Sequence, residues 1–186
     1  QEMQREAERA REEAADLKAE TAWLRLRLAD SYMRSGKVAR AIAEYKRAIK
    51  LDKQNGVFHT RLADAYVGHE DIPAAIEAYK KAITIDPLLA DPHSSLGDLY
   101  LRYGKLRVAL EQYREAVRLE GDRAFFRYQL GDTLERLGQH DEARQELEQA
   151  ALLAPQVPFY RFRVATVYQA MGMHEVAYMH MRMVCT

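Results

Sequence analysis

Apolar residues recur at intervals of three and four along almost the whole chain, which is the spacing that gives an α-helix one apolar face. The apolar stretches come in pairs. In four of the five pairs, the short polar segment between the two stretches holds a glycine that can end a helix. In the second pair Glu70 takes that place, so we expect a more constrained or differently built turn there. The pattern predicts ten helices, at residues 22–35, 38–52, 56–69, 72–85, 90–103, 106–119, 124–137, 140–153, 158–171 and 174–185.

The predicted helix pairs also repeat in sequence, with a period of 34 residues. In the first helix of each pair, a leucine or valine is followed by a small residue. The next residue is usually aspartate, and the residue two positions after that is usually tyrosine. The five copies of this motif begin at Leu28, Leu62, Leu96, Leu130 and Val164. In the second helix, small residues recur at Ala41, Ala75, Ala109, Ala143 and Ala177. A fixed period of this length is typical of repeat proteins whose units stabilise one another by stacking.

These motifs resemble the tetratricopeptide repeat (TPR) family, whose pattern of a large residue, Leu-Gly, Tyr and then Ala, an aromatic residue, Ala and Pro has the same period. The resemblance covers residues 22–186. It implies an all-α fold, a right-handed α-solenoid whose first helix is extended at its N-terminus. The five helix-turn-helix units would be residues 22–55, 56–89, 90–123, 124–157 and 158–186.

The composition narrows the possible functions. The 28 basic and 28 acidic residues cancel, whereas a chain that holds nucleic acid usually has a basic excess, so we expect no nucleic-acid partner. One cysteine excludes an intramolecular disulfide and a zinc site of several cysteines. No apolar run suits a membrane span, and no phosphate loop, zinc motif or catalytic spacing is present. We expect no enzyme activity, no catalytic residues, no cofactor, no metal and no direct membrane insertion. We also expect a cytoplasmic location, with the soluble part of a membrane-anchored protein as the alternative.

Residues 1–21 form a charged segment that differs from the repeats, with seven acidic and four basic residues. No glycine or proline separates this segment from the first repeat, so one helix is expected from about residue 2 to residue 35. Its apolar residues step alternately by four and by three, which is a heptad pattern. The resulting coiled-coil seam comprises Met3, Ala7, Ala10, Ala14, Leu17, Thr21 and Leu24, with Leu28 next in step.

The charges beside this seam alternate in a regular way. With Met3 at a d position, the g positions hold acids and the e positions hold bases, namely Glu6, Glu13 and Glu20 against Arg11, Lys18 and Arg25. In a parallel dimer each g residue faces the e residue five positions along its partner, so all three pairs join opposite charges. One interpretation is therefore a parallel homodimer through residues 1–28. The alternatives are a solvated helix, or a helix packed on another protein or on a segment upstream of residue 1. They arise because the alanine-rich seam buries little area and because Leu24 and Leu28 are also expected to pack in the first repeat.

The TPR resemblance implies that certain positions of the first helices line a concave groove. Position 9 is aspartate in four units, at Asp30, Asp64, Asp98 and Asp132. An arginine follows four residues later in three of them, at Arg34, Arg102 and Arg136, and Gly68 holds this place in the second unit. Acid and base at this spacing form ion pairs on a helix surface. The aspartates are interpreted either as such surface pairs or as a strip that binds the backbone or basic side chains of a peptide.

Positions 2 and 5 of the last two units are aromatic, at Phe125, Tyr128, Phe159 and Phe162. Aromatic side chains are frequent anchors of protein interfaces, so these four residues predict a pocket for an apolar side chain of a partner. The alternative is that the rings only cover neighbouring helices. The predicted partner-binding groove therefore comprises these aromatic residues together with Asp30, Asp64, Asp98, Asp132, Arg102 and Arg136.

The leading hypothesis is a non-catalytic scaffold that binds a peptide or a helix of a partner protein in this groove. One alternative is a module that assembles with itself through the leader and the methionine-rich last helix, where Met179 and Met183 form an apolar pair. A second is an RNA-binding solenoid. The acidic aspartates of the groove argue against it, and the arginines of the first helices argue for it, namely Arg27, Arg61, Arg127, Arg161 and Arg163. A third is a regulatory domain of a larger enzyme.

Overall fold

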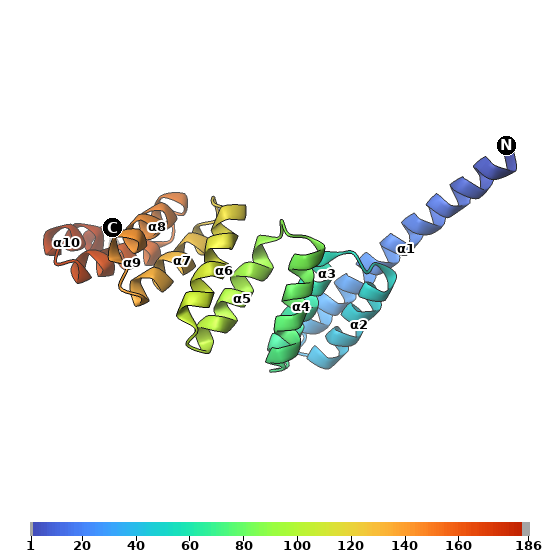
Figure 1. Ribbon diagram of the computed structural model, residues 1–186, viewed down its shortest axis with the longest axis horizontal. Coiled ribbons are helices and arrows are strands. Elements are labelled where there is room, and N and C mark those ends of the chain that lie inside the picture. Colours follow the sequence, from blue (N-terminus) through green and yellow to red (C-terminus); the bar gives the residue numbers. More distant parts are fainter. Residues whose placement is uncertain (1, 184–186) are drawn as a thin grey trace. The chain divides into compact units, whose positions relative to one another are not determined.

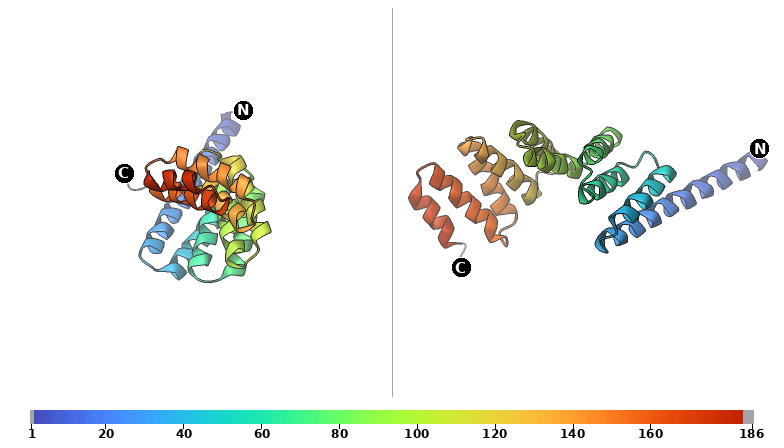
Figure 2. Two further views of the ribbon diagram at one scale, coloured as in Figure 1. Left: turned by 90° about the vertical axis from the view of Figure 1, so that its left-hand side faces the viewer. Right: turned by 90° about the horizontal axis from the view of Figure 1, so that it is seen from below.

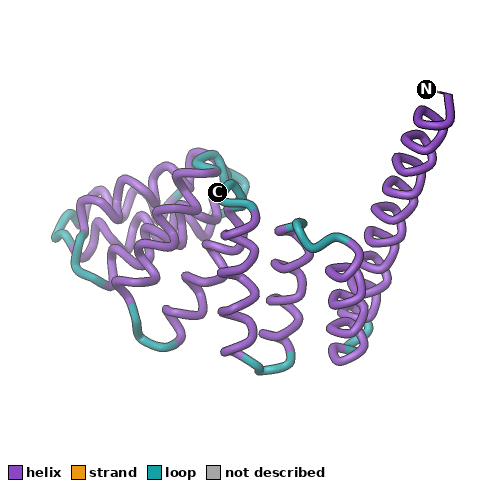
Figure 3. The backbone as a smooth tube through the Cα atoms, turned by 45° about the vertical axis from the view of Figure 1, so that its right-hand side comes forward, coloured by secondary structure: helices purple, strands orange, loops and turns teal. Residues whose placement is uncertain are grey.

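The structure is a computed structural model that describes residues 2–183, and these residues form helices joined by short loops, with no strand among them (Figures 1 and 3). The ten predicted helices are confirmed, most of them to within one residue at each end. The helix expected over residues 174–185 ends at Arg182, and residues 184–186 lie outside the described part. The helices are α1 (Glu2–Arg34), α2 (Val38–Leu51), α3 (Gly56–Gly68), α4 (Ile72–Ile85), α5 (Ala90–Arg102), α6 (Leu106–Leu119), α7 (Ala124–Arg136), α8 (His140–Leu153), α9 (Pro158–Ala170) and α10 (His174–Arg182).

Internal contacts group the helices into two compact units. Unit 1 comprises residues 1–89, with α1 to α4, and unit 2 comprises residues 90–186, with α5 to α10. Within each unit, every odd-numbered helix packs along the even-numbered helix that follows it, and that helix packs on the next pair (Figure 2). In the described residues, no helix has the length and apolar character needed to cross a lipid bilayer.

All five helix pairs turn through the same hydrogen-bonded cap. In the first pair, the backbone N–H of Gly36 donates to Met33 and that of Lys37 donates to Tyr32, which is the Schellman arrangement. This cap requires a positive φ, and Gly36 has a φ of 70°. The same two bonds close the turn at Glu70, whose φ is 62°. The expectation of a differently built turn there is therefore wrong, because a non-glycine residue adopts the same left-handed conformation at a cost in strain.

Glycines inside α5 and α7 let the two helices of a repeat approach closely. A Cβ atom on Gly97 would lie 2.5 Å from Cε1 of Tyr113, and one on Gly131 would lie 2.7 Å from Cγ of Leu147. Tyr113 and Leu147 are buried and belong to the core of unit 2. The side chains of Tyr113 and Leu147, on the second helix of each pair, therefore lie directly against the first helix at its glycine.

Helix α1 has two apolar sides within unit 1. Ala22, Leu26 and Ala29 are buried in the core that α1 forms with α2 and α3. Leu24 and Leu28 remain exposed, so the expectation that they also pack in the first repeat is wrong. The two sets lie on opposite sides of the helix because residues two apart point about 200° apart. The first half of α1 extends past α2 and α3, and all side chains from Met3 to Glu20 are exposed (Figure 1).

Candidate functional site

In the first three repeats, the aspartate that recurs in the first helix accepts a hydrogen bond from a tyrosine of the following helix. The hydroxyl of Tyr113 donates to Oδ1 of Asp98 at 2.7 Å. The pairs Tyr45–Asp30 and Tyr79–Asp64 have the same geometry, at 2.5 Å and 2.6 Å. The two residues of each pair are 15 positions apart in the chain, and each pair joins the two helices of one repeat.

These tyrosines are strong donors held in their neutral form. Burial raises the pKa of the Tyr45 and Tyr113 hydroxyls well above the ordinary value, and the hydrogen bonds to Asp30 and Asp98 raise it further. Partial desolvation also raises the pKa of Asp98, although the hydrogen bonds it accepts act in the opposite direction. One oxygen of each of these aspartates is therefore used to hold its repeat together.

The fourth repeat uses a different partner because Leu147 stands where the tyrosine would be. Nη2 of Arg163, from α9, binds both Asp132 Oδ1 and Glu135 Oε2. Nε of Arg136 lies 2.9 Å from Oδ2 of the same aspartate. Asp132 is only 8% exposed, and both of its oxygens are thus used within the fold. The network fixes α7 against α9.

Only one of the three ion pairs expected along single helices is formed in the described residues. Asp132 pairs with Arg136, as the spacing predicts. Asp30 and Asp98 are bound instead by tyrosines, and their expected partners, Arg34 and Arg102, are exposed. The tyrosine hydroxyl reaches the carboxylate from the neighbouring helix and takes the place that the arginine was expected to have.

A buried glutamine links the aspartate of one repeat to the next repeat. The amide of Gln129 donates to Oδ1 of Asp98 at 2.7 Å and accepts from the hydroxyl of Ser94 at 2.6 Å. Both hydrogen bonds on Asp98 end on Oδ1, and its side chain is exposed, so Oδ2 can accept a hydrogen bond from a bound molecule. Sequence reasoning missed this contact and that of Arg163. The signal was an interval of 31 residues, which separates Gln129 from Asp98 and Arg163 from Asp132.

The predicted aromatic residues meet across α7 and α9. The ring of Tyr128 lies 5.3 Å from that of Phe159, edge to face, and 6.3 Å from that of Phe125. The buried ring of Tyr160, which was not expected from the sequence, also contacts Tyr128, with ring centroids 5.6 Å apart. Phe162 lies on α9 one turn beyond Phe159. Phe125, Phe159 and Phe162 remain 47%, 46% and 39% exposed. We call the surface formed by Phe125, Tyr128, Phe159 and Phe162 the aromatic face of unit 2.

Unit 1 offers a smaller version of this surface. Trp23 is exposed and lies edge to face on Phe58, with ring centroids 5.1 Å apart. Asp30 and Asp64 follow on α1 and α3, and the guanidinium of Arg61 lies 3.8 Å from Asp64. The positions of unit 1 equivalent to the aromatic face hold Trp23, Leu26, Val57 and Thr60, so only one of them is aromatic.

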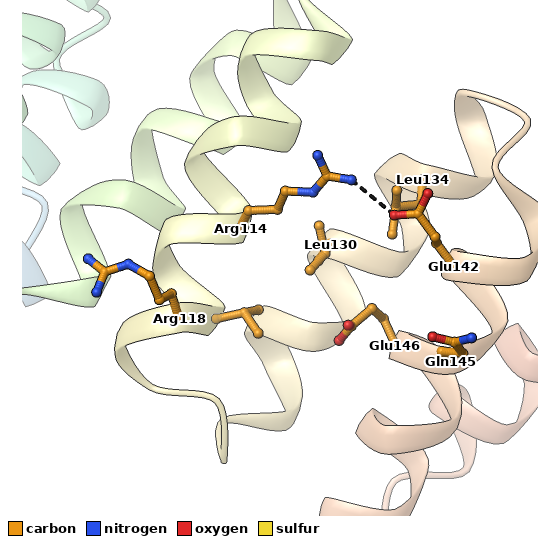
Figure 4. Close-up of a pocket in the computed structure, with 8 residues that line it drawn as sticks. Arg114, Arg118, Leu130, Leu134, Glu142, Gln145 and Glu146 are labelled. Carbon is orange, nitrogen blue, oxygen red and sulfur yellow. Dashed lines mark hydrogen bonds and ion pairs between the residues drawn. The ribbon is translucent and has the colours of Figure 1, made fainter.

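A hollow in unit 2 lies on the other side of α7 from the aromatic face. It has a volume of about 290 Å³ and lies between α6 and α8, with Leu130 and Leu134 at its base (Figure 4). Its rim is spanned by the ion pair between Arg114 and Glu142, at 3.0 Å. Leu130 points away from the aromatic face because it is two residues beyond Tyr128. This hollow is therefore separate from the predicted groove.

The histidines at equivalent repeat positions serve packing. His59 is half-buried, and burial lowers its pKa, an effect that the positive charge of Lys81 reinforces. Nδ1 of His93 lies 3.0 Å from the amide oxygen of Gln112 on the paired helix. The described residues contain no group of histidine, cysteine and acidic side chains placed to bind a metal ion.

Two of the arginines that suggested RNA binding are used inside unit 2. Arg163 binds Asp132 and Glu135, as described above. Arg127 is paired with Glu146 at 2.8 Å, and its Nε donates to the carbonyl of Gly121. These contacts leave fewer free cations on the first helices than the sequence suggested.

Repeated helix pairs that stack on one another define a helical repeat protein. The profile of the tetratricopeptide repeat matches residues 26–90 and 95–160, so the chain belongs to the TPR family. A search of curated protein sequences found no match.

Solved structures share the fold at low sequence identity. MamA is 23% identical, with 89% of this chain and 90% of that chain covered and a TM-score of 0.76. PilF of Pseudomonas aeruginosa is 18% identical, with 90% and 77% covered and a TM-score of 0.80. YrrB, described as a TPR protein with an unusual peptide-binding site, is 22% identical, with 92% and 89% covered and a TM-score of 0.71. These likenesses show the fold alone.

Proposed function

We propose that this chain is a non-catalytic scaffold that binds a peptide or a helix of a partner protein, with the aromatic face of unit 2 as its main anchor. The observation that carries the proposal is the meeting of Phe125, Tyr128 and Phe159 from two repeats, with the exposed Phe162 one turn further along α9. The three phenylalanines have no polar group to favour exposure. Clustered exposed apolar rings are typical of interaction sites because a partner removes them from water.

The surroundings of the aromatic face favour a preformed site. Tyr128 is held between α7 and α9 by the rings of Phe159 and Tyr160. The ion pairs of Arg163 fix the same two helices one to two turns further on. A site that is rigid before binding loses less conformational entropy when its partner arrives.

The polar groups beside the aromatic face indicate what the partner offers. Gln129, next to Tyr128 in sequence, holds Asp98, whose second oxygen can accept from a backbone amide or a basic side chain. Asp132 contributes indirectly, since it positions Arg163 and Arg136. We therefore expect a partner segment that places an apolar side chain on the aromatic face and a hydrogen-bond donor at Asp98. TPR proteins generally mediate protein–protein interactions, and YrrB, with its unusual peptide-binding site, supports peptide binding by a fold of this kind.

The proposal is tested by selecting peptides from a displayed random library on the complete chain and measuring their affinity by fluorescence anisotropy. Replacing two anchors, Phe125→Ala with Phe159→Ala, should weaken binding at least tenfold. The matched control replaces two exposed leucines of α8, Leu152→Ala with Leu153→Ala, and should change affinity less than twofold. Circular dichroism verifies that both variants keep their helices. Selected peptides that bind all three proteins equally would reject the aromatic face as the anchor.

A further inference from the structure

The heptad seam of α1 is exposed in unit 1 except at Thr21, which is half-buried. The seam residues from Met3 to Leu17 are exposed, and Leu24 and Leu28 are still 56% and 43% exposed where α1 packs in the first repeat. The exposed seam therefore continues from the leader onto the repeat, with the half-buried Thr21 between the two parts.

Packing in the repeat and pairing along the seam use opposite sides of α1. In the heptad that places Leu24 at d and Leu28 at a, the buried residues Ala22, Leu26 and Ala29 occupy the b, f and b positions. Positions b and f point away from the partner in a two-stranded coiled coil. Within unit 1, a second helix can thus lie along the seam while α2 keeps its place.

The charges beside the seam specify what that second helix is. The g positions are acidic, at Glu6, Glu13 and Glu20, and the e positions are basic, at Arg11, Lys18 and Arg25. A parallel pair brings each acid of one chain beside a base of the other. An antiparallel pair would bring g beside g and e beside e, so these acids would face acids and these bases would face bases, except where Arg27, which is also at g, met an acid. We propose that α1 pairs with α1 of a second copy of this chain, as a parallel and in-register coiled coil over residues 3–28.

The three charge pairs are not equivalent. Nη1 of Arg25 lies 2.9 Å from Oε2 of Glu44, which is buried on α2, so Arg25 is already bound within its own chain. The pairs Glu6–Arg11 and Glu13–Lys18 lie in the leader, whose side chains are exposed and free to reach a partner. Each occurs twice in a symmetric dimer, so four ion pairs depend on these residues.

The association is expected to be concentration-dependent because four of the seam residues are alanine or threonine and contribute little apolar area. Dimerisation would present two aromatic faces in one particle, which would increase the avidity for a partner with two binding segments. The inference itself does not rest on the proposed function, since it involves a different side chain set and a different unit.

Sedimentation equilibrium of the complete chain over a wide concentration range tests the proposal. All proteins carry Cys185→Ser, because the single cysteine of the sequence could otherwise form disulfides between copies. One variant makes the leader basic on both flanks, with Glu6→Lys and Glu13→Lys. The other makes it acidic on both flanks, with Arg11→Glu and Lys18→Glu. Each variant alone should dimerise at least tenfold more weakly than the parent, and their equimolar mixture should recover the parent affinity as a heterodimer.

A disulfide scan tests the orientation in the same Cys185→Ser background. Met3→Cys, at a d position, should form a covalent dimer on mild oxidation, because in-register parallel helices place the two copies side by side. The control Glu8→Cys, at a b position, should form it at least fivefold more slowly. A parent that stays monomeric at every concentration, a mixture that fails to form heterodimers, or equal rates for the two cysteine variants would each overturn the proposal. The first result would leave the aromatic face unaffected, since peptide affinity is measured independently.

Discussion

The ring of Tyr113 lies directly against Gly97, so closely that a Cβ atom there would be 2.5 Å from Cε1. This contact brings the tyrosine hydroxyl to Asp98, the next residue along α5. The small residue before the aspartate, the aspartate itself and the tyrosine 15 positions later thus form one structural unit. In the first three repeats this unit gives the aspartate a structural role without reference to any partner.

Gly97→Ala should destabilise the chain despite the better helix propensity of alanine. Alanine gains about 1 kcal/mol over glycine inside a helix, but the buried ring of Tyr113 has to move, which costs about 3 kcal/mol. We expect a net loss of about 2 kcal/mol in the free energy of unfolding, measured by urea denaturation. Gly68→Ala is the matched control, since its Cβ would meet only ordinary contacts at 3.6 Å or more. It should leave the stability unchanged or raise it by about 0.5 kcal/mol.

The raised pKa of Tyr113 predicts that the free energy of unfolding falls at alkaline pH. The pKa of Tyr113 is raised in the folded chain above the ordinary value of about 10, so its stabilising effect is complete below pH 10. Above that pH the unfolded chain loses the proton while the folded chain keeps it, and the free energy of unfolding falls. Tyr113→Phe should be less stable by about 1 kcal/mol at pH 8 but should lose less stability between pH 9.5 and pH 11. Urea titrations at each pH measure both quantities. If the exposed control Tyr178→Phe flattened the pH dependence equally, burial of Tyr113 would not be the cause.

Arg163 should be the main stabiliser of the junction between α7 and α9. Arg163→Ala leaves Asp132 and Glu135 without their shared cation in a poorly solvated place, so a loss of about 2 kcal/mol in unfolding free energy is expected. Combining it with Asp132→Ala should cost clearly less than the sum of the two single changes. Additive losses in this double-mutant cycle would mean that the ion pair contributes nothing.

Glu70→Gly should stabilise the second turn. Glu70 is exposed and has a φ of 62°, a conformation that costs a non-glycine residue about 1 kcal/mol. The variant should raise the unfolding free energy by about that amount, and Gly104→Ala, at the equivalent turn of the third repeat, should lower it similarly. A stability unchanged by both substitutions would show that the turns bear no strain.

The helices were predictable because their signals are local. Apolar spacing and the turn glycines at positions such as Gly36 and Gly104 determine where each helix begins and ends. The turn at Glu70 was mispredicted because the hydrogen bonds of the cap impose the left-handed conformation even on an unfavourable residue. The residue type at position 70 indicates an unfavourable left-handed conformation, but it does not indicate that the hydrogen bonds of the cap are strong enough to impose it.

The contacts of the aspartates were harder to predict because they join different helices. Arg34 and Arg102 are neighbours of Asp30 and Asp98 on one helix, but the competing tyrosines arrive from the next helix. Likewise, α1 has two apolar stripes, and its sequence alone does not indicate that the stripe with Leu26 rather than Leu24 meets α2. The contact between Tyr128 and Phe159 was easier to predict, because the repeat geometry brings the first helices of adjacent repeats together.

The most direct test of the central claim is a two-dimensional NMR titration of the complete chain with a peptide selected on it. The proposed function predicts that the largest amide shifts surround Phe125, Tyr128 and Phe159 on α7 and α9, with smaller shifts near Asp98. Shifts concentrated instead around Arg114 and Glu142, on the opposite side of unit 2, would contradict it.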